Sequence, residues 1–137
     1  MSLRRKARET ALQILYKIDM SEGAPSVEGL DGGPLAPGTE ARRYCDELVA
    51  GVTSRLDEIN RTIEAHSENW TIERMAIVDR NILRIAVYEL LYSKDVPYKV
   101  VIDEAVELAK RYGTEESGAF VNGIIDKVRK KTGSQGA

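Results

Sequence analysis

The chain has 137 residues, 42% of them hydrophobic and 31% charged, with a formal net charge of −2. These values are ordinary for one globular domain that can bury a core, and the longest apolar runs are far too short to span a membrane. Cys45 and His66 are the only residues of their kinds, which excludes an internal disulfide and the usual zinc sites. No phosphate-binding glycine motif or catalytic constellation is present.

The first predicted helix covers residues 4–20, where Ala7, Ala11, Leu15 and Ile18 recur at helical spacing. Residues 21–39 then hold five of the eleven glycines and three of the four prolines. A stretch of that composition predicts a long, mobile loop.

Thr39 is the predicted cap of the next helix, whose apolar stripe continues to His66. Gly51 and the Thr and Ser that follow predict a break into two helices. Cys45 belongs to the stripe, so we interpret it as a core residue and not a reactive thiol.

The second half of the chain continues the helical pattern. Thr71 opens a short helical turn, and Asp79 is the predicted cap of a helix over 80–92, whose wide apolar arc indicates a central position. Residues 93–97 form a predicted turn.

A helix over 99–112 is expected to end at Gly113, and Thr114 to cap the last helix. Carboxylates are densest on the helix over 99–112, at positions 103, 104 and 107. We interpret them as part of a solvated helix face and not as a metal site. No strand pattern appears. The chain is therefore predicted to be all-α, a compact bundle of six or seven helices.

Positive charge is concentrated at the start of the chain. Residues 1–20 carry five basic and two acidic side chains, whereas residues 21–70 carry four and ten. Arg8 and Glu9 interrupt any apolar stretch that would follow the basic start, so we expect no signal peptide and a cytoplasmic protein. On a helical wheel Arg5 and Arg8 align with Leu12 and Tyr16 along one flank of the core stripe.

Guanidiniums in this arrangement suit phosphate binding and base stacking, and basic groups oppose the dipole at a helix start. The alternative is a basic helix end that only aids solubility, and charge alone leaves the two interpretations equally open. Phe120 on the last helix either stacks on an unpaired base or packs at the core rim.

Two segments of the sequence are specific: "RRKARETALQILY" at 4–16 and "VDRNILRIAVYELLYSKDVPYKVVIDEAVELAKRYGTEESGAFVNGIIDKV" at 78–128. With "ELVAGV" at 47–52 and "NW" at 69–70, they resemble the NusB transcription antitermination factors of bacteria. The resemblance implies one helical domain over most of the chain, made of two small helical halves.

We expect the halves to be subdomains 1–70, which includes the mobile loop, and 71–132, with a flexible tail at 133–137. The resemblance also implies a heterodimer with NusE, a ribosomal small-subunit protein, and binding of boxA, a short single-stranded element of nascent RNA. Other Nus factors and RNA polymerase would be reached indirectly, in support of ribosomal RNA synthesis. The resemblance implies no catalytic activity and no cofactor. A homodimer is also allowed by an exposed face of Tyr and Leu. The alternative is a helical scaffold that binds proteins and no RNA.

The resemblance implies RNA contacts from a set of mostly basic residues: Arg4, Arg5, Lys6, Arg8, Lys99, Phe120 and Asn122. It implies partner contacts from Tyr16, Asp79 and Arg84. In the expected arrangement the arginines of the first helix point outward and Phe120 reaches the same surface. Two departures weaken the second patch: Ala119 replaces a usual lysine, and Asp103 replaces the asparagine of a usual "INEA".

Overall fold

The computed structural model describes residues 3–21, 35–93 and 95–132, and within these ranges it contains six α-helices, one 3₁₀ turn and no strand. The elements in chain order are α1 Leu3–Met20, α2 Glu40–Ser54, α3 Leu56–Ala65, η1 Ile72–Arg74, α4 Ile77–Tyr92, α5 Tyr98–Tyr112 and α6 Ser117–Thr132. The predicted all-α class and number of helices are confirmed. Most of the predicted loop, residues 22–34, and the predicted tail lie outside the described residues.

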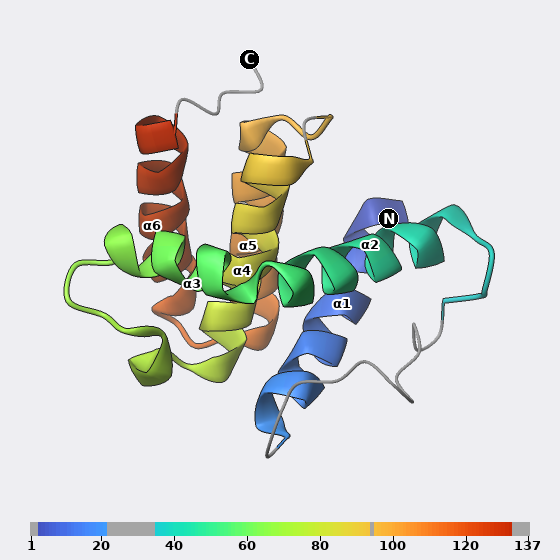
Figure 1. The fold of residues 1–137 in the computed structure, drawn as a ribbon, viewed down its shortest axis with the longest axis horizontal. Coiled ribbons are helices and arrows are strands. Elements are labelled where there is room, and N and C mark those ends of the chain that lie inside the picture. The colour runs from blue at the N-terminus through green and yellow to red at the C-terminus, as the bar shows by residue number, and fades with distance from the viewer. Residues whose placement is uncertain (1–2, 22–34, 94, 133–137) are drawn as a thin grey trace.

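Helix α4 lies at the centre of the bundle. It packs against each of the other five α-helices, while α1 also packs on α2 and α5 on α6 (Figure 1). A helix can be surrounded in this way only if apolar side chains cover most of its circumference, as they do in α4. The prediction of a central helix is confirmed.

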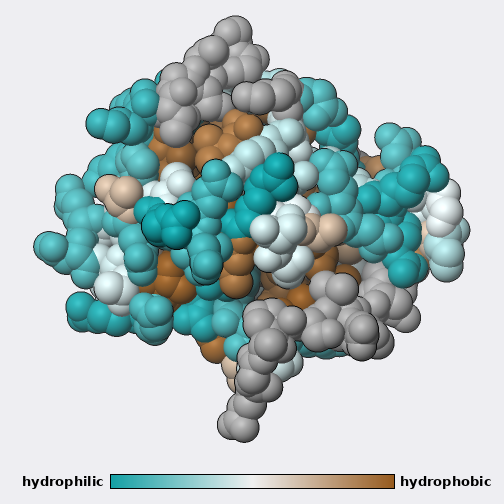
Figure 2. All heavy atoms as spheres, viewed as in Figure 1, coloured by the Kyte–Doolittle hydropathy of each residue, from teal (hydrophilic) through white to brown (hydrophobic). Residues whose placement is uncertain are grey.

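One cluster of buried apolar side chains runs through all six helices. The division into subdomains at residue 70 therefore stays a prediction, because both halves contribute to the same core. Cys45 is fully buried in this cluster, and burial raises the pKa of its thiol to about 11. It is a packing residue, as predicted. On the outside, polar and charged side chains cover much of the face seen in Figure 2, with apolar atoms visible between them.

The break between α2 and α3 falls at Arg55, directly after the predicted Gly51–Ser54 segment. The start of α2 also agrees with the sequence, since the Thr39 hydroxyl accepts a hydrogen bond from the Arg42 N–H at 3.2 Å. This contact satisfies one of the free N–H groups of the first turn.

Two predicted caps are wrong. Asp79 lies inside the first turn of α4, which begins two residues earlier at Ile77. Thr114 precedes α6, which begins at Ser117, and the Ser117 hydroxyl instead accepts from the Thr114 N–H at 2.9 Å. In both cases the apolar periodicity placed the helix, but the nearest polar residue did not mark where it begins. The residue before α4 is Ala76, which makes no side-chain cap, and several polar residues precede α6.

Candidate nucleic-acid interface

The three arginines at the start of α1 are each paired with a carboxylate from another part of the chain. The Arg4 Nη2 atom lies 2.8 Å from Asp95 in the turn before α5. Arg5 forms a two-bond fork with Glu104 of α5, at 3.0 and 2.7 Å. Arg8 donates to Glu89 of α4 at 2.8 Å. The basic start is thus largely neutralised within the protein.

Arg8 does not point outward, and that expectation is wrong. Its side chain is only 3% exposed and Glu89 only 2%. Burial alone would lower the pKa of the Arg8 guanidinium, but the hydrogen bond and charge of Glu89 more than offset this and raise it. Both α2 and α4 cover α1, so its buried face is wider than the core stripe and also includes Leu12.

The remaining cations at the start of α1 reach the surface. The Arg4 and Arg5 side chains are 39% and 40% exposed, and the Arg4 guanidinium lies 4.5 Å above the Tyr44 ring. Lys6 is exposed and, within the described part of the chain, no carboxylate pairs with it.

Further cations lie at the same end of the bundle. Lys99 is exposed on the first turn of α5, and the Arg129 guanidinium of α6 lies 4.3 Å from the neighbouring Tyr98 ring. Because the Arg4 pair fixes α1 beside the turn before α5, one end of the molecule gathers the start of α1, the start of α5 and the end of α6. We call this group of exposed cations, Arg4, Lys6 and Lys99, the cationic end.

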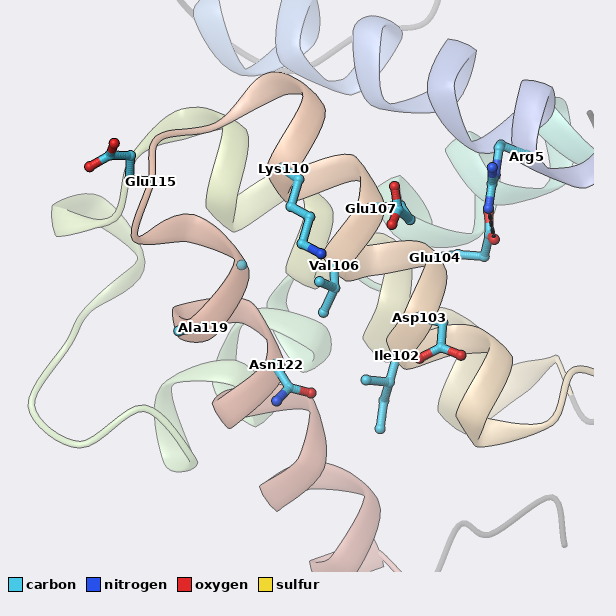
Figure 3. Close-up of a pocket in the computed structure, with 11 residues that line it drawn as sticks. Arg5, Ile102, Asp103, Glu104, Val106, Glu107, Lys110, Glu115, Ala119 and Asn122 are labelled. Carbon is cyan, nitrogen blue, oxygen red and sulfur yellow. Dashed lines mark hydrogen bonds and ion pairs between the residues drawn. The ribbon is translucent and has the colours of Figure 1, made fainter.

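A groove of about 720 Å³ runs between α5 and α6, with Arg5 at its edge. Figure 3 shows Arg5 extending from α1 to Glu104, with Asn122 and Ala119 on the α6 side. The structure therefore brings Arg5 and Asn122 to one groove. Its charged lining residues are Arg5, Lys110, Asp103, Glu104, Glu107 and Glu115.

The groove is lined by four carboxylates and only two cations. It is therefore unfavourable for a polyanion, because like charges repel. The sequence departures at Ala119 and Asp103 both line it. Glu104 is only 15% exposed, so the interpretation of this carboxylate as part of a solvated face is wrong. Its partner Arg5, 99 residues earlier in the chain, could not be inferred from helix periodicity.

Phe120 does not reach this groove, and the expected common surface with the arginines is not formed. Its ring packs edge-on against Trp70, with ring centroids 5.8 Å apart at 73°. Residues two apart on a helix are separated by about 200°, so Asn122 and Phe120 face opposite sides of α6. Phe120 is half-buried at the rim of the core, the alternative that the sequence left open.

The predicted partner residues differ in accessibility. Tyr16 is 38% exposed on α1, and Asp79 is half-buried in the first turn of α4. Arg84 is only 6% exposed, so its assignment to a partner surface is wrong.

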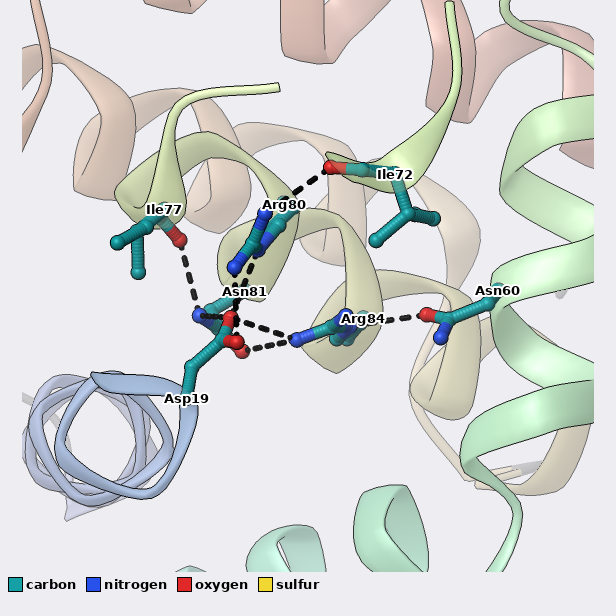
Figure 4. Close-up of polar contacts among 7 residues, drawn as sticks. All are labelled: Asp19, Asn60, Ile72, Ile77, Arg80, Asn81 and Arg84. Atoms are coloured by element: carbon teal, nitrogen blue, oxygen red, sulfur yellow. Dashed lines mark hydrogen bonds and ion pairs between the residues drawn. The ribbon is translucent and has the colours of Figure 1, made fainter. Parts of the chain in front are cut away.

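Arg84 belongs to a polar network inside the protein (Figure 4). It donates to Asp19 of α1 and to Asn60 of α3, both at 2.9 Å. Arg80 and Asn81 of α4 also donate to Asp19, at 2.7 to 2.9 Å. Burial lowers the pKa of the Arg84 guanidinium, and Asp19 opposes that change. The network ties the end of α1 to the start of α4.

Two kinds of site find no support in the described ranges. No group of three His, Cys, Asp or Glu side chains there is arranged to hold a metal ion. None of the helices placed in the structure is long and apolar enough to cross a membrane.

Comparison with known proteins gives consistent matches. The NusB family model matches residues 5–130. The transcription antitermination protein NusB of Desulfatibacillum aliphaticivorans is 47% identical over 137 residues, covering 98% of this chain and 95% of the relative. The NusB protein of Myxococcus xanthus strain DK1622 is 47% identical over 134 residues, covering 93% and 95%. A solved structure of the antitermination factors NusB and NusE with double-stranded RNA contains a chain with a TM-score of 0.81 and 32% identity, covering 96% and 98%.

Proposed function

The chain belongs to the NusB family, and from that premise we propose that it is a transcription antitermination factor that binds boxA-type single-stranded RNA together with NusE. The observation that carries this proposal is the match along nearly the whole chain to proteins of that name. Its role is regulatory and not enzymatic, and it requires no cofactor. The role places it in the cytoplasm beside RNA polymerase, which it reaches with other Nus factors to support ribosomal RNA transcription.

The cationic end supports phosphate contact by Arg4, Lys6 and Lys99. Exposed lysine and arginine side chains release counterions when they neutralise phosphates, and this supplies much of the affinity for RNA. Arg5 contributes through the part of its guanidinium that Glu104 leaves exposed. Arg8 is not among the proposed RNA contacts, because its guanidinium is buried with Glu89.

A strand that contacts both Asn122 and Phe120 must cross the start of α6, since the two side chains lie on opposite sides. Ala119 and Gly123 are exposed on this helix. Apart from the two neighbouring residues and the backbone of α6 itself, no atom lies within 4 Å of the place where a Cβ of Gly123 would be. The crossing path therefore carries no bulky side chain, which supports a contact at both residues.

The proposed NusE contact lies toward the other end of α1. Tyr16 is exposed one turn before Met20, which is 55% exposed, and the Asp19 network brings this end of α1 beside Asp79 on α4. Exposed aromatic and Met side chains are enriched in protein interfaces. A homodimer formed through the same exposed residues, Tyr16 and Met20, is the alternative to NusE binding at this surface.

RNA binding is tested by fluorescence anisotropy with a boxA-type strand, a scrambled strand and a duplex, each with and without NusE. We expect tighter binding of the boxA-type strand, increased by NusE because the partner adds contacts to the same RNA. Lys6→Ala and Lys99→Ala should weaken binding, and each should flatten the dependence on log salt by about one unit.

Lys17→Ala is the matched control, since it removes the same charge from the far end of α1. Normal complex formation with NusE but no RNA binding at any salt would favour the alternative of a protein-binding scaffold. Self-association is read separately by sedimentation of the chain alone.

A further inference from the structure

Glu104 holds Arg5 in the geometry that a phosphate would use. Two parallel N–H···O bonds join the guanidinium edge to the carboxylate, from Nε at 3.0 Å and from Nη2 at 2.7 Å. A guanidinium binds two phosphate oxygens through the same edge. Carboxylate and phosphate therefore compete for one set of donors.

Glu104 is held firmly in its ionised form. The hydrogen bond from Arg5 lowers the pKa of the Glu104 carboxyl, and this exceeds the opposite effect of burial. A second guanidinium, that of Arg8, has its Nη1 atom 3.7 Å from the same carboxylate. Arg8 is itself enclosed with Glu89, so Glu104 lies between a buried guanidinium and the exposed guanidinium of Arg5.

Resting on the function proposed above, we propose that Glu104 limits the affinity of the chain for RNA by competing with a backbone phosphate for the Arg5 guanidinium. A phosphate that approaches Arg5 must displace this carboxylate or share the guanidinium with it. It also meets the charges of Asp103 and Glu107, which line the same groove. The same competition operates more weakly at Asp95, whose pair with Arg4 is more exposed.

The test is the RNA affinity of Glu104→Gln, with and without NusE. The variant keeps the shape of the side chain and one acceptor oxygen but removes the charge. We expect binding about fivefold tighter at low salt, as for the loss of one like charge near a phosphate. The slope against log salt should become steeper by about 0.7, the value for one phosphate contact to a single strand, because Arg5 gains a full phosphate contact.

Glu107→Gln is the matched control, since it removes the same charge one turn along α5 from the same groove, but no hydrogen bond joins Glu107 to Arg5 in the described structure. It should change affinity by less than about twofold. In an Arg5→Ala background, Glu104→Gln should have no effect beyond this level, because the released guanidinium is absent. Circular dichroism verifies that each variant is folded.

Unchanged or weaker RNA binding by folded Glu104→Gln would overturn the inference, and weaker binding would mean that Glu104 positions Arg5 for RNA. If Glu104→Gln does not fold, Asp95→Asn decides in its place, since it releases Arg4 at an exposed turn. A modest gain supports the competition and no gain overturns it. Failure of the wild-type chain to bind any RNA with NusE present would instead overturn the proposed function.

Discussion

Arg8 and Glu89 form an ion pair enclosed between α1 and α4, with Nη2 and Oε2 2.8 Å apart and both side chains almost without solvent exposure. Tyr44 of α2 donates its hydroxyl to the same carboxylate. Side chains from α1, α2 and α4 thus meet at the buried Glu89 carboxylate. Such a pair adds little net stability over apolar packing, but removal of one partner leaves the other charged and unpaired.

Arg8→Ala should therefore lower the free energy of unfolding by about 3–5 kcal/mol, measured by urea denaturation. Lys130→Ala, which breaks an exposed pair with Asp126, is the control and should change it by less than about 0.5 kcal/mol. RNA binding by Arg8→Ala should fall only in proportion to the fraction of the variant that is unfolded. A stable Arg8→Ala protein with weakened RNA binding would restore Arg8 to the RNA surface.

The positions of the helices could be predicted from the sequence because they depend on local periodicity. The inward direction of the Arg8 side chain could not be predicted. Arg8 lies at the edge of the apolar stripe of α1, where a charged side chain turns inward only if a partner of opposite charge is present. That partner, Glu89, is 81 residues away. The sequence did contain a signal, a single carboxylate within the apolar arc of the central helix, since a buried charge requires a counter-charge.

The candidate site could be predicted in part. The basic start of α1 and Lys99 do lie at one end of the molecule, and Asn122 does share a groove with Arg5. The neutralisation of the arginines was missed because Glu104 and Asp95 are distant in the chain. Arg84 was misassigned for the same reason, since its partners Asp19 and Asn60 come from other helices.

Gly51 on α2 is required by the Tyr88 ring of α4. A Cβ at residue 51 would lie 2.1 to 2.8 Å from three carbons of that ring, and Tyr88 is itself buried. Gly51→Ala should destabilise the protein by about 1–3 kcal/mol through overpacking. Gly123→Ala, at an open helical site, should instead stabilise it by roughly 0.5–1 kcal/mol. Thermal unfolding measures both, and a tolerated Gly51→Ala would show that α2 and α4 can separate.

The Asp19 network makes stability depend on acid pH. Burial would raise the pKa of the Asp19 carboxyl, but hydrogen bonds from Arg80 and Asn81 and the charge of Arg84 hold it below its ordinary value of 3.8. The Asp19 carboxyl binds a proton more readily in the unfolded chain than in the folded one. The contribution of Asp19 to the free energy of unfolding is therefore fully present above pH 3.8 and is lost as the pH falls through the lower pKa of the folded state.

Asp19→Asn should be less stable at neutral pH and should lose less stability between neutral and acid pH than the wild type. Urea denaturation at a series of pH values measures the difference between the two curves. Parallel curves would show that Asp19 has the same pKa in the folded and unfolded chains.

Tyr16→Ala should weaken NusE binding without changing the fold, because the side chain is 38% exposed on α1 and a buried interface tyrosine contributes about 2 kcal/mol or more. Titration calorimetry should show a dissociation constant raised by at least about tenfold, with the affinity of the chain alone for RNA unchanged. Tyr112→Ala is the matched control, since that residue is equally exposed at the end of α5. If the Tyr112 variant loses NusE and the Tyr16 variant does not, the partner surface lies at the end of α5 and not along α1.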